Sequence, residues 1–176
     1  MRTYVFYHGG CLDGFGAAWS ARKELGDGVR YVPHHPGQPV PDDLRPDSRV
    51  FILDLGFPRD RLLELRERHR ELRVVDHHAT WEPEMADLPF VTFDREHSAA
   101  VLAWRLFVPG REVPLLLRHV EDSDLARFEM DGTRAVTAAL SSYSMEFDVW
   151  DRLRVDDLRD EGEAIERYRE RSAAQT

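Results

Sequence analysis

The sequence predicts an α/β fold, in which a Rossmann-like parallel sheet is flanked by helices and followed by a helical C-terminal part. Short apolar runs rich in β-branched and aromatic residues alternate with amphipathic segments over the first half of the chain. This alternation is typical of βαβ units, whose strands all run in one direction. Beyond residue 98 the pattern is helical throughout, so the sheet is expected to end before that point.

The first third of the chain predicts a strand, a helix and a second strand. Residues 3–8, TYVFYH, form a compact β-rich run, and residues 15–25 carry apolar side chains at helical spacing. This helix is expected to stop near Gly26. VRYVP, residues 29–33, is the second strand, and the Pro-, Asp- and Gly-rich residues 34–48 form a loop.

The middle of the chain continues the same alternation. VFILD, residues 50–54, has the apolar character of a buried strand. Residues 59–72, RDRLLELRERHREL, place leucines among charges at helical spacing. LRVVD at 72–76 and LPFVTF at 88–93 are the last two expected strands.

Four helices are expected next, and then a charged tail. We predict one domain over residues 1–155 and a charged, connector-like helix over 156–176. No second domain is expected within this sequence. The helical segments are SAAVLAWRLF (98–107), VPLLLRHVED (113–122), RAVTAALSSY (134–143) and FDVWDRL (147–153).

Composition narrows the class of protein. The 176 residues are 42% apolar and 32% charged, the balance of an ordinary globular protein. No apolar run approaches the ~20 residues of a membrane-spanning helix, and the N-terminus is expected to be a strand instead of a secretory signal. The net charge of −9 argues against a protein that coats long duplex nucleic acid. The single cysteine, Cys11, supports no internal disulfide and favours the cytoplasm.

Polar residues follow three of the predicted strands. His8 ends the first strand, Asp54 ends the third, and Asp76, His77 and His78 end the fourth. The carboxyl ends of parallel strands share one edge of a sheet, where open α/β folds bind ligands. Mixed histidine nitrogens and carboxylate oxygens favour a first-row divalent metal. Taken singly, each residue is explained as well by a turn, a helix cap or a structural role.

These segments resemble the DHH phosphoesterase superfamily, which is named for the tripeptide found here at residues 76–78. That superfamily includes single-strand-specific exonucleases, oligoribonucleases, cyclic-dinucleotide phosphodiesterases and manganese-dependent pyrophosphatases. The resemblance covers most of the chain in five ordered motifs. These are HGGCLDGFGAAW, ILDLGFP, VVDHHAT, EHSAAVLAW and VEDSDLARF.

The resemblance implies a centre of two ions, Mn²⁺ or Mg²⁺, that activate water for attack on phosphorus. His8 and Asp54 would hold one ion. Asp13, Asp54, His77 and an acidic residue of the last motif would hold the other, with Asp124 as first choice and Asp122 as second. His78 would face the scissile phosphate, and Asp76 would orient a neighbouring ring.

Two further residues have alternative interpretations. Gly14 allows close backbone approach where the first strand turns into a helix, either toward a phosphate or only within a tight turn. Ser98 is expected at a helix N-cap, where the helix N-terminus could also receive phosphate oxygens. Plain capping is the preferred interpretation of Ser98.

The first motif departs from the family pattern. Many relatives have two aspartates there, whereas this chain has Cys11-Leu12-Asp13. Cysteine is a poor ligand for manganese or magnesium and a good one for zinc. A zinc ion near Cys11 is therefore an open alternative.

The expected function is a metal-dependent phosphohydrolase of the phosphodiesterase or exonuclease kind. Its expected substrate is a small phosphate-bearing molecule or a short single-stranded oligonucleotide, with no membrane partner. Pyrophosphatase or polyphosphatase activity is an alternative, because the same ions serve phosphoanhydrides. A non-catalytic nucleotide-binding or regulatory module is the alternative from a different class.

Overall fold

The computed structural model describes residues 2–40 and 44–173. They form two compact units, Met1–Glu112 and Val113–Thr176, which are described separately. The division differs from the predicted domain, which ran to residue 155, because a helix beyond residue 112 packs on the tail helix and also on the helix before it. Residues 41–43 of the predicted loop and 174–176 of the predicted connector lie outside the described residues.

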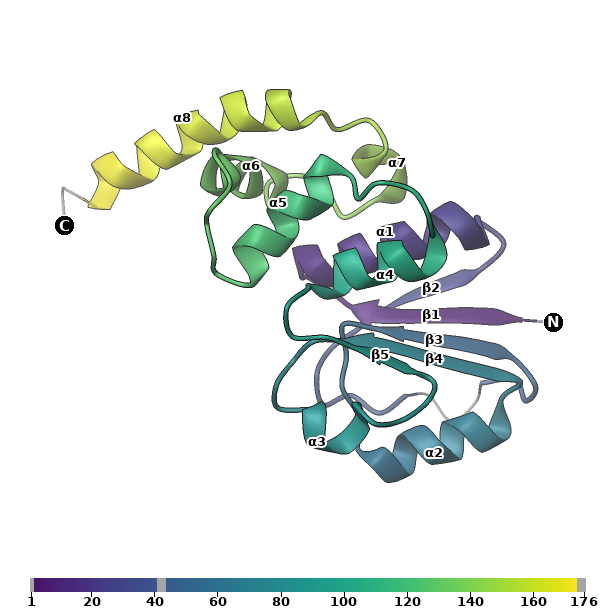
Figure 1. Cartoon of the computed structure of the whole chain (residues 1–176). Helices are drawn as coiled ribbons and strands as arrows, with labels where there is room; N and C mark the ends of the chain where they lie inside the picture. Colours follow the sequence, from purple (N-terminus) through teal and green to yellow (C-terminus); the bar gives the residue numbers. More distant parts are fainter. Residues whose placement is uncertain (1, 41–43, 174–176) are drawn as a thin grey trace. The chain divides into compact units, whose positions relative to one another are not determined.

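The first unit is built on a sheet of five parallel strands in the order β2-β1-β3-β4-β5 (Figure 1). This arrangement confirms the predicted α/β fold class. Since β1, β3 and β4 are neighbours, the three polar strand ends lie on one stretch of the same edge. The strands are β1 (Thr3–His8), β2 (Arg30–His34), β3 (Arg49–Leu53), β4 (Glu71–Asp76) and β5 (Val91–Phe93).

Helices cover both faces of this sheet (Figure 1). On one face lie α1 (Leu12–Leu25) and α4 (Ala99–Phe107), which pack against each other. The rings of Trp19 and Trp104 stack there with centroids 5.9 Å apart, and aromatic area of this kind dominates core packing. On the other face lie α2 (Arg59–Arg68) and the short α3 (Glu82–Met85), which the sequence did not predict.

Helix α2 ends four residues before its predicted end. Leu72 follows Leu65 at helical spacing, so the pattern extends the helix to residue 72. In the structure the helix ends at Arg68 and β4 begins at Glu71. Leu72 is buried in the same core cluster as Leu65, but it reaches that cluster from the sheet. Tertiary packing therefore decided an ambiguity that periodicity left open.

The second unit contains only helices within the described residues. They are α5 (Leu115–Asp124), α6 (Thr133–Leu140), α7 (Phe147–Trp150) and α8 (Val155–Ala173). Helix α6 packs on both α5 and α8. Gly162 of α8 lies so close to α6 that a Cβ atom there would overlap the backbone carbonyl of Ala135. The side chains of Trp150 in α7 and Leu158 in α8 are fully buried.

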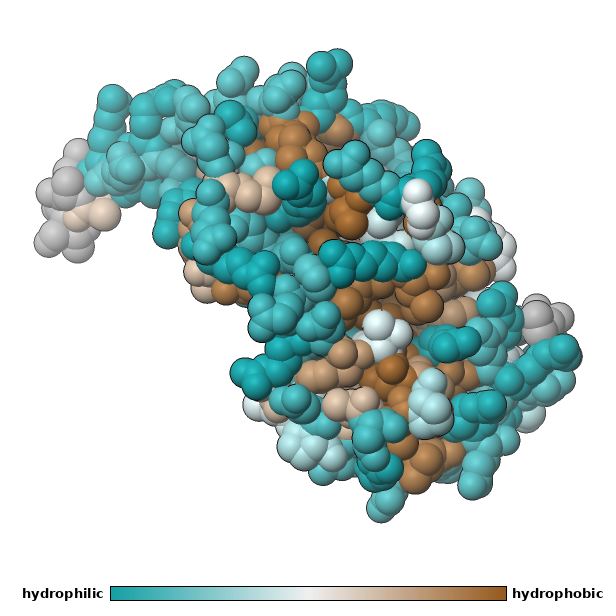
Figure 2. Space-filling view, viewed as in Figure 1, coloured by the Kyte–Doolittle hydropathy of each residue, from teal (hydrophilic) through white to brown (hydrophobic). Residues whose placement is uncertain are grey.

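Hydrophilic residues dominate the visible surface of α8, the yellow helix of Figure 1 (Figure 2). Its sequence from residue 155 to 173 is rich in arginine, aspartate and glutamate, and Tyr168 is 72% exposed. Among the described residues, no helix combines the length and the apolar character that crossing a bilayer requires.

We predict that Gly162→Val destabilises the second unit. The new side chain must displace the α6 backbone at Ala135, which costs about 1–3 kcal/mol as an overpacked contact. Urea denaturation followed by circular dichroism measures the change. Ala164→Val adds a similar side chain at an exposed position of the same helix and should change stability by less than about 0.5 kcal/mol. Equal effects of the two substitutions would contradict the close-approach interpretation.

Candidate metal centre

The structure brings together the polar residues that follow β1, β3 and β4. His8 Nδ1 lies 3.2 Å from Asp54 Oδ2. His77 Nε2 lies 3.5 Å from the other oxygen, Asp54 Oδ1. Asp54 therefore sits between two histidines from different strands, one at each carboxylate oxygen. The convergence expected from the strand ends is present in the structure.

Asp54 is held in an unusual position. It is 2% exposed, and its φ of 60° lies in the left-handed region, which costs a non-glycine residue about 1–3 kcal/mol. Its backbone N–H donates to the Val75 carbonyl at 2.8 Å. Burial would raise the pKa of the Asp54 carboxyl, but its interactions with His77 and His8 and the nearby charge of His78 outweigh that effect and hold the pKa below its ordinary value.

Asp13 reaches the centre from the first turn of α1. It is 1% exposed, and its Oδ2 lies 3.6 Å from His77 Nε2. Both of its oxygens also accept backbone N–H bonds, from Ala99 at 2.8 Å and Ala100 at 2.9 Å. These N–H groups are the first of α4, so a residue 86 positions away in sequence caps that helix. The positive end of α4 in turn stabilises and orients the carboxylate.

This contact changes the interpretation of Ser98. The residue occupies the N-cap position of α4 as predicted, but its hydroxyl makes no capping hydrogen bond. Asp13 performs that function instead. We predicted that the start of this helix could also bind phosphate oxygens. Two of the N–H donors needed for that, those of Ala99 and Ala100, are already bonded to Asp13.

Gly14 provides close approach within the protein itself. A Cβ atom at this buried position would overlap the backbone carbonyl of His8. The missing side chain thus lets the start of α1 lie against the end of β1. Of the two interpretations of Gly14, the structure supports the tight turn and not the approach to a phosphate.

The DHH tripeptide presents its three side chains differently. Asp76 is fully buried, and its Oδ1 accepts hydrogen bonds from the backbone N–H groups of His77 at 2.7 Å and His78 at 3.2 Å. The same oxygen lies 2.7 Å from His78 Nδ1. Because a carboxylate only accepts, His78 carries its proton on Nδ1 in the neutral ring. Asp76 therefore orients the half-exposed His78 ring, as the family resemblance implied.

The other oxygen of Asp76 was not anticipated. Asp76 Oδ2 and Asp54 Oδ1 are buried carboxylate oxygens without a hydrogen bond in the described part of the chain. One ligand atom each from Asp54, Asp76, His77 and His78 falls within 4.8 Å of the others. Asp76 can therefore contribute a ligand as well as orient a ring. No feature of the sequence separates these two roles.

Cys11 lies close to the Asp54 carboxylate. It is the N-cap residue of α1, and ligand atoms of His8, Cys11 and Asp54 lie within 4.8 Å of one another. Burial raises the pKa of the Cys11 thiol to about 12, and the negative charge of Asp54 adds to that rise.

The distances in this cluster match those expected around an ion. Ligands about 2.0–2.2 Å from one ion lie roughly 3–3.6 Å from each other. The contacts of Asp54 with His8 and His77, and of Asp13 with His77, span 3.2 to 3.6 Å. Buried oxygens without hydrogen bonds call for an explanation such as a bound ion. The donor set and its spacing therefore fit divalent metal.

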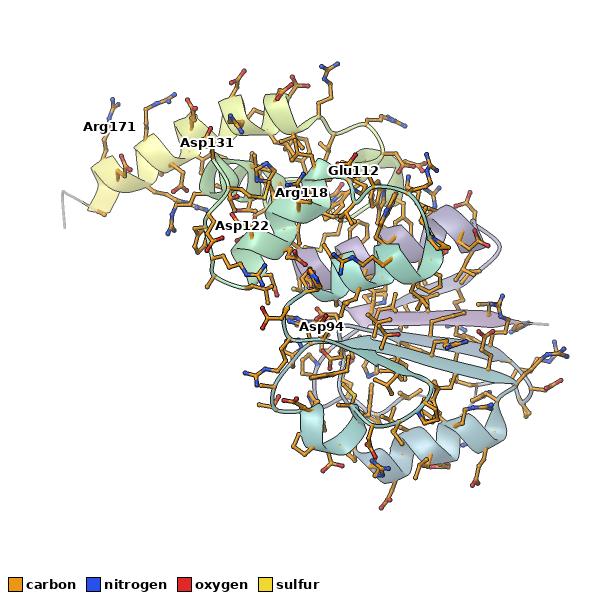
Figure 3. The ribbon with its side chains drawn as sticks, viewed as in Figure 1. Asp94, Glu112, Arg118, Asp122, Asp131 and Arg171 are labelled. Carbon is orange, nitrogen blue, oxygen red and sulfur yellow. The ribbon has the colours of Figure 1, made fainter. Side chains whose placement is uncertain are left out.

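The two candidate carboxylates of the last motif belong to the second unit, and they differ sharply there. Asp122, labelled in Figure 3, is 5% exposed and accepts hydrogen bonds from the backbone of Glu129 at 2.9 Å and Met130 at 3.1 Å. It also accepts a 2.5 Å bond from the Thr133 hydroxyl. Asp124 is exposed at the C-terminal end of α5. The Asp122 carboxylate is thus engaged within its own unit.

A buried chain of polar groups extends from Asp122. The Thr133 hydroxyl donates its hydrogen to Asp122, so it accepts the hydrogen bond from His119 Nδ1 at 2.9 Å. Burial would raise the pKa of the Asp122 carboxyl, but the bonds from Thr133 and the backbone lower it below its ordinary value. Sequence reasoning missed His119 and Thr133, because neither spacing nor motif joins them to Asp122.

Comparisons with known proteins support the fold and assign no activity. No model of a known protein family matches the chain. The chain is 26% identical over 164 residues to the uncharacterized protein R106 of Acanthamoeba polyphaga mimivirus, covering 84% of this chain and 39% of the viral protein. It also resembles the crystal structure of an uncharacterized protein from Helicobacter pylori G27, with a TM-score of 0.61 at 14% identity.

The structural match covers 91% of this chain and 54% of the Helicobacter chain. At that identity the likeness concerns the fold alone, and it agrees with the parallel sheet described above. The chain thus spans about two fifths of the viral protein and about half of the bacterial one.

We predict that Asp122→Asn lowers the stability of the second unit by about 1–3 kcal/mol at pH 7, because the NH2 group of the asparagine amide would face a hydrogen-bond donor. The folded-state pKa of Asp122 lies below the unfolded value of about 3.9. Its stabilisation is therefore complete above that value and is lost as the pH falls through the lowered pKa.

Urea denaturation of the wild type and the variant between pH 3 and pH 8 measures this difference. The stability gap should be constant near neutral pH and shrink below about pH 4. Asp124→Asn, at an exposed position, is the matched control and should change stability by less than about 0.5 kcal/mol. A gap that is independent of pH would contradict the assigned network.

Proposed function

We propose that this protein is a divalent-metal-dependent phosphoesterase that hydrolyses phosphodiester or phosphate bonds of short oligonucleotides or small nucleotides. The proposal combines the resemblance to the DHH phosphoesterases with the cluster at the carboxyl edge of β1, β3 and β4. The observation that carries it is Asp54, a buried carboxylate between His8 and His77 whose Oδ1 accepts no hydrogen bond within the described residues.

Burial of several carboxylates in one place supports a cationic ligand. Asp13, Asp54 and Asp76 are each at most 2% exposed, and burying unpaired charge is costly. Backbone N–H bonds offset part of this cost at Asp13 and Asp76. Carboxylate oxygens of Asp13 and Asp54 lie near His77 Nε2, where they could accept a cation. A divalent cation neutralises this group of carboxylates better than water does.

Each residue has a distinct task in the proposed reaction. Divalent ions held by the cluster would supply Lewis acidity and would lower the pKa of an attacking water. Asp54 fixes the relative positions of the two ligand groups because it contributes to both. Asp13 is kept rigid by the start of α4, and rigid ligands avoid reorganisation cost during the reaction.

His78 is suited to handle a proton at the leaving group. Its Nδ1 is fixed by Asp76 at 2.7 Å, and its side chain is 45% exposed, so the ring is accessible from solvent. The imidazolium form of the ring would keep this contact with the Asp76 carboxylate. In that form His78 can donate a proton from Nε2 or stabilise charge on a phosphoryl oxygen.

The charge of the chain favours small substrates. A net charge of −9 repels long polyanions, which bind through broad basic surfaces. A short oligonucleotide or a small nucleotide carries fewer phosphates and requires only local neutralisation. In the second unit, the engagement of Asp122 within its own network makes Asp124 the preferred candidate for the acidic ligand implied by the resemblance.

We predict that the purified protein hydrolyses bis-p-nitrophenyl phosphate in the presence of Mn²⁺ and loses this activity with chelator. Asp54→Asn should lower the rate by at least about 100-fold, because it removes the shared charged ligand. Asp60→Asn, at an exposed site on α2, should leave the rate unchanged. Short RNA, short DNA, cyclic dinucleotides and pyrophosphate then define the substrate. Tight nucleotide binding without turnover with any divalent ion would instead favour a non-catalytic module.

We predict that His78→Ala separates catalysis from metal binding. The substitution should lower kcat by about 100- to 10,000-fold, the range for loss of a general acid, and leave the bound metal content unchanged. Elemental analysis of the dialysed protein provides the second measurement. His35→Ala, at an exposed histidine next to β2, is the control for a change of surface charge. Loss of metal together with activity would show that His78 acts as a ligand.

A further inference from the structure

We propose that His8, Cys11 and Asp54 form a thiolate-containing site that selects a borderline-soft divalent ion, Zn²⁺ above all, in place of Mn²⁺ or Mg²⁺. This inference rests on the proposed function only in treating the cluster as a metal centre. Ligand atoms of the three residues lie within 4.8 Å of one another. His8 Nδ1 and Asp54 Oδ2 are 3.2 Å apart, a separation that suits ligands of one ion.

A second observation points to a ligand at the carboxylate that this site shares with His77. The Asp54 side chain is 1% exposed, and its Oδ1 accepts no hydrogen bond in the described part of the chain. Cys11 occupies the N-cap of α1, yet its side chain makes no capping hydrogen bond. The Cys11 thiol thus lies next to a buried carboxylate that has one oxygen near His8 and one oxygen without a hydrogen bond.

The backbone holds the cysteine in fixed relation to the histidine. Gly10, between them, has a φ of 75°, a conformation that glycine adopts without strain. The N–H of Gly9 donates to the His34 carbonyl at 2.8 Å, which ties the turn to β2. Because Gly14 lets the start of α1 lie against the backbone of His8, the spacing between His8 and Cys11 is set by packing.

The donor set determines the preferred ion. One imidazole nitrogen, one thiolate sulfur and one carboxylate oxygen, with a position left for water or substrate, resemble the ligand composition of catalytic zinc sites. Thiolate favours zinc and cobalt and is a poor ligand for manganese and magnesium. The neighbouring group of Asp13, Asp54 and His77 is richer in oxygen. Of the two ligand groups that share Asp54, the one with Cys11 therefore offers the softer ligand atoms.

Cobalt provides a direct test, because thiolate coordination gives Co²⁺ an intense near-ultraviolet charge-transfer band. We expect this band on titration of the metal-free wild-type chain and in His35→Ala, and we expect its absence in Cys11→Ser. The chain has one cysteine, so the band reports Cys11 alone. Zinc affinity, measured by competition with a chromophoric chelator, should fall by roughly 100-fold or more in Cys11→Ser, since loss of even an outer-shell residue costs 10–100-fold.

Cys11→Asp tests the selectivity itself. It replaces sulfur with a hard oxygen ligand and should raise Mn²⁺ affinity while lowering that for Zn²⁺, so the ratio of the two affinities changes by at least about 100-fold. Circular dichroism establishes that each variant is folded, and Cys11→Asp keeps the test decisive if Cys11→Ser is not. Absence of the band in the wild type, or an unchanged zinc-to-manganese ratio in Cys11→Asp, overturns the proposal.

These measurements are made without substrate, so the two proposals fail separately. Zinc bound through Cys11 in a protein that hydrolyses no phosphoester would refute the proposed function and leave this site standing. Manganese-dependent hydrolysis without thiolate coordination would refute this site alone.

Discussion

The buried carboxylate of Asp54 is the interaction on which the candidate site depends. Its position follows from the parallel sheet, because β3 lies between β1 and β4 and all three end at the same edge. The left-handed backbone at Asp54 turns the side chain toward His8 and His77. Strain of this kind persists only where the surrounding structure fixes it. The hydrogen bond from the Asp54 N–H to β4 is one such constraint.

Asp13 couples the site to the packing of the helices. The same carboxylate that approaches His77 also caps α4 through Ala99 and Ala100. Helices α1 and α4 pack against each other, so a shift of either helix would move a candidate ligand. The stability of the helical layer and the geometry of the candidate metal centre therefore depend on the same carboxylate. This coupling explains how the Asp13 carboxylate stays buried in one orientation.

The second unit uses a buried carboxylate in a different way. Asp122 is satisfied by two backbone N–H groups and the Thr133 hydroxyl, and it organises the loop between α5 and α6. Its neighbour in the motif, Asp124, is exposed. A saturated carboxylate stabilises a fold, whereas Asp54 and Asp76 each keep an oxygen without a hydrogen bond. Hydrogen-bond saturation, and not burial, therefore separates Asp122 from Asp54 and Asp76 in this chain.

The sequence by itself determined the fold class, the β1 strand at residues 3–8 and the polar residues at three strand ends, because periodicity and strand direction are local properties. It extended α2 too far and missed α3, since short apolar spacings fit a helix and a strand equally well. Only the tertiary structure decided that Asp13 caps α4, that Asp122 belongs to a loop network and that Cys11 lies beside His8 and Asp54. Each of these depends on contacts between side chains and backbone that the chain brings together only on folding, and no local pattern encodes them.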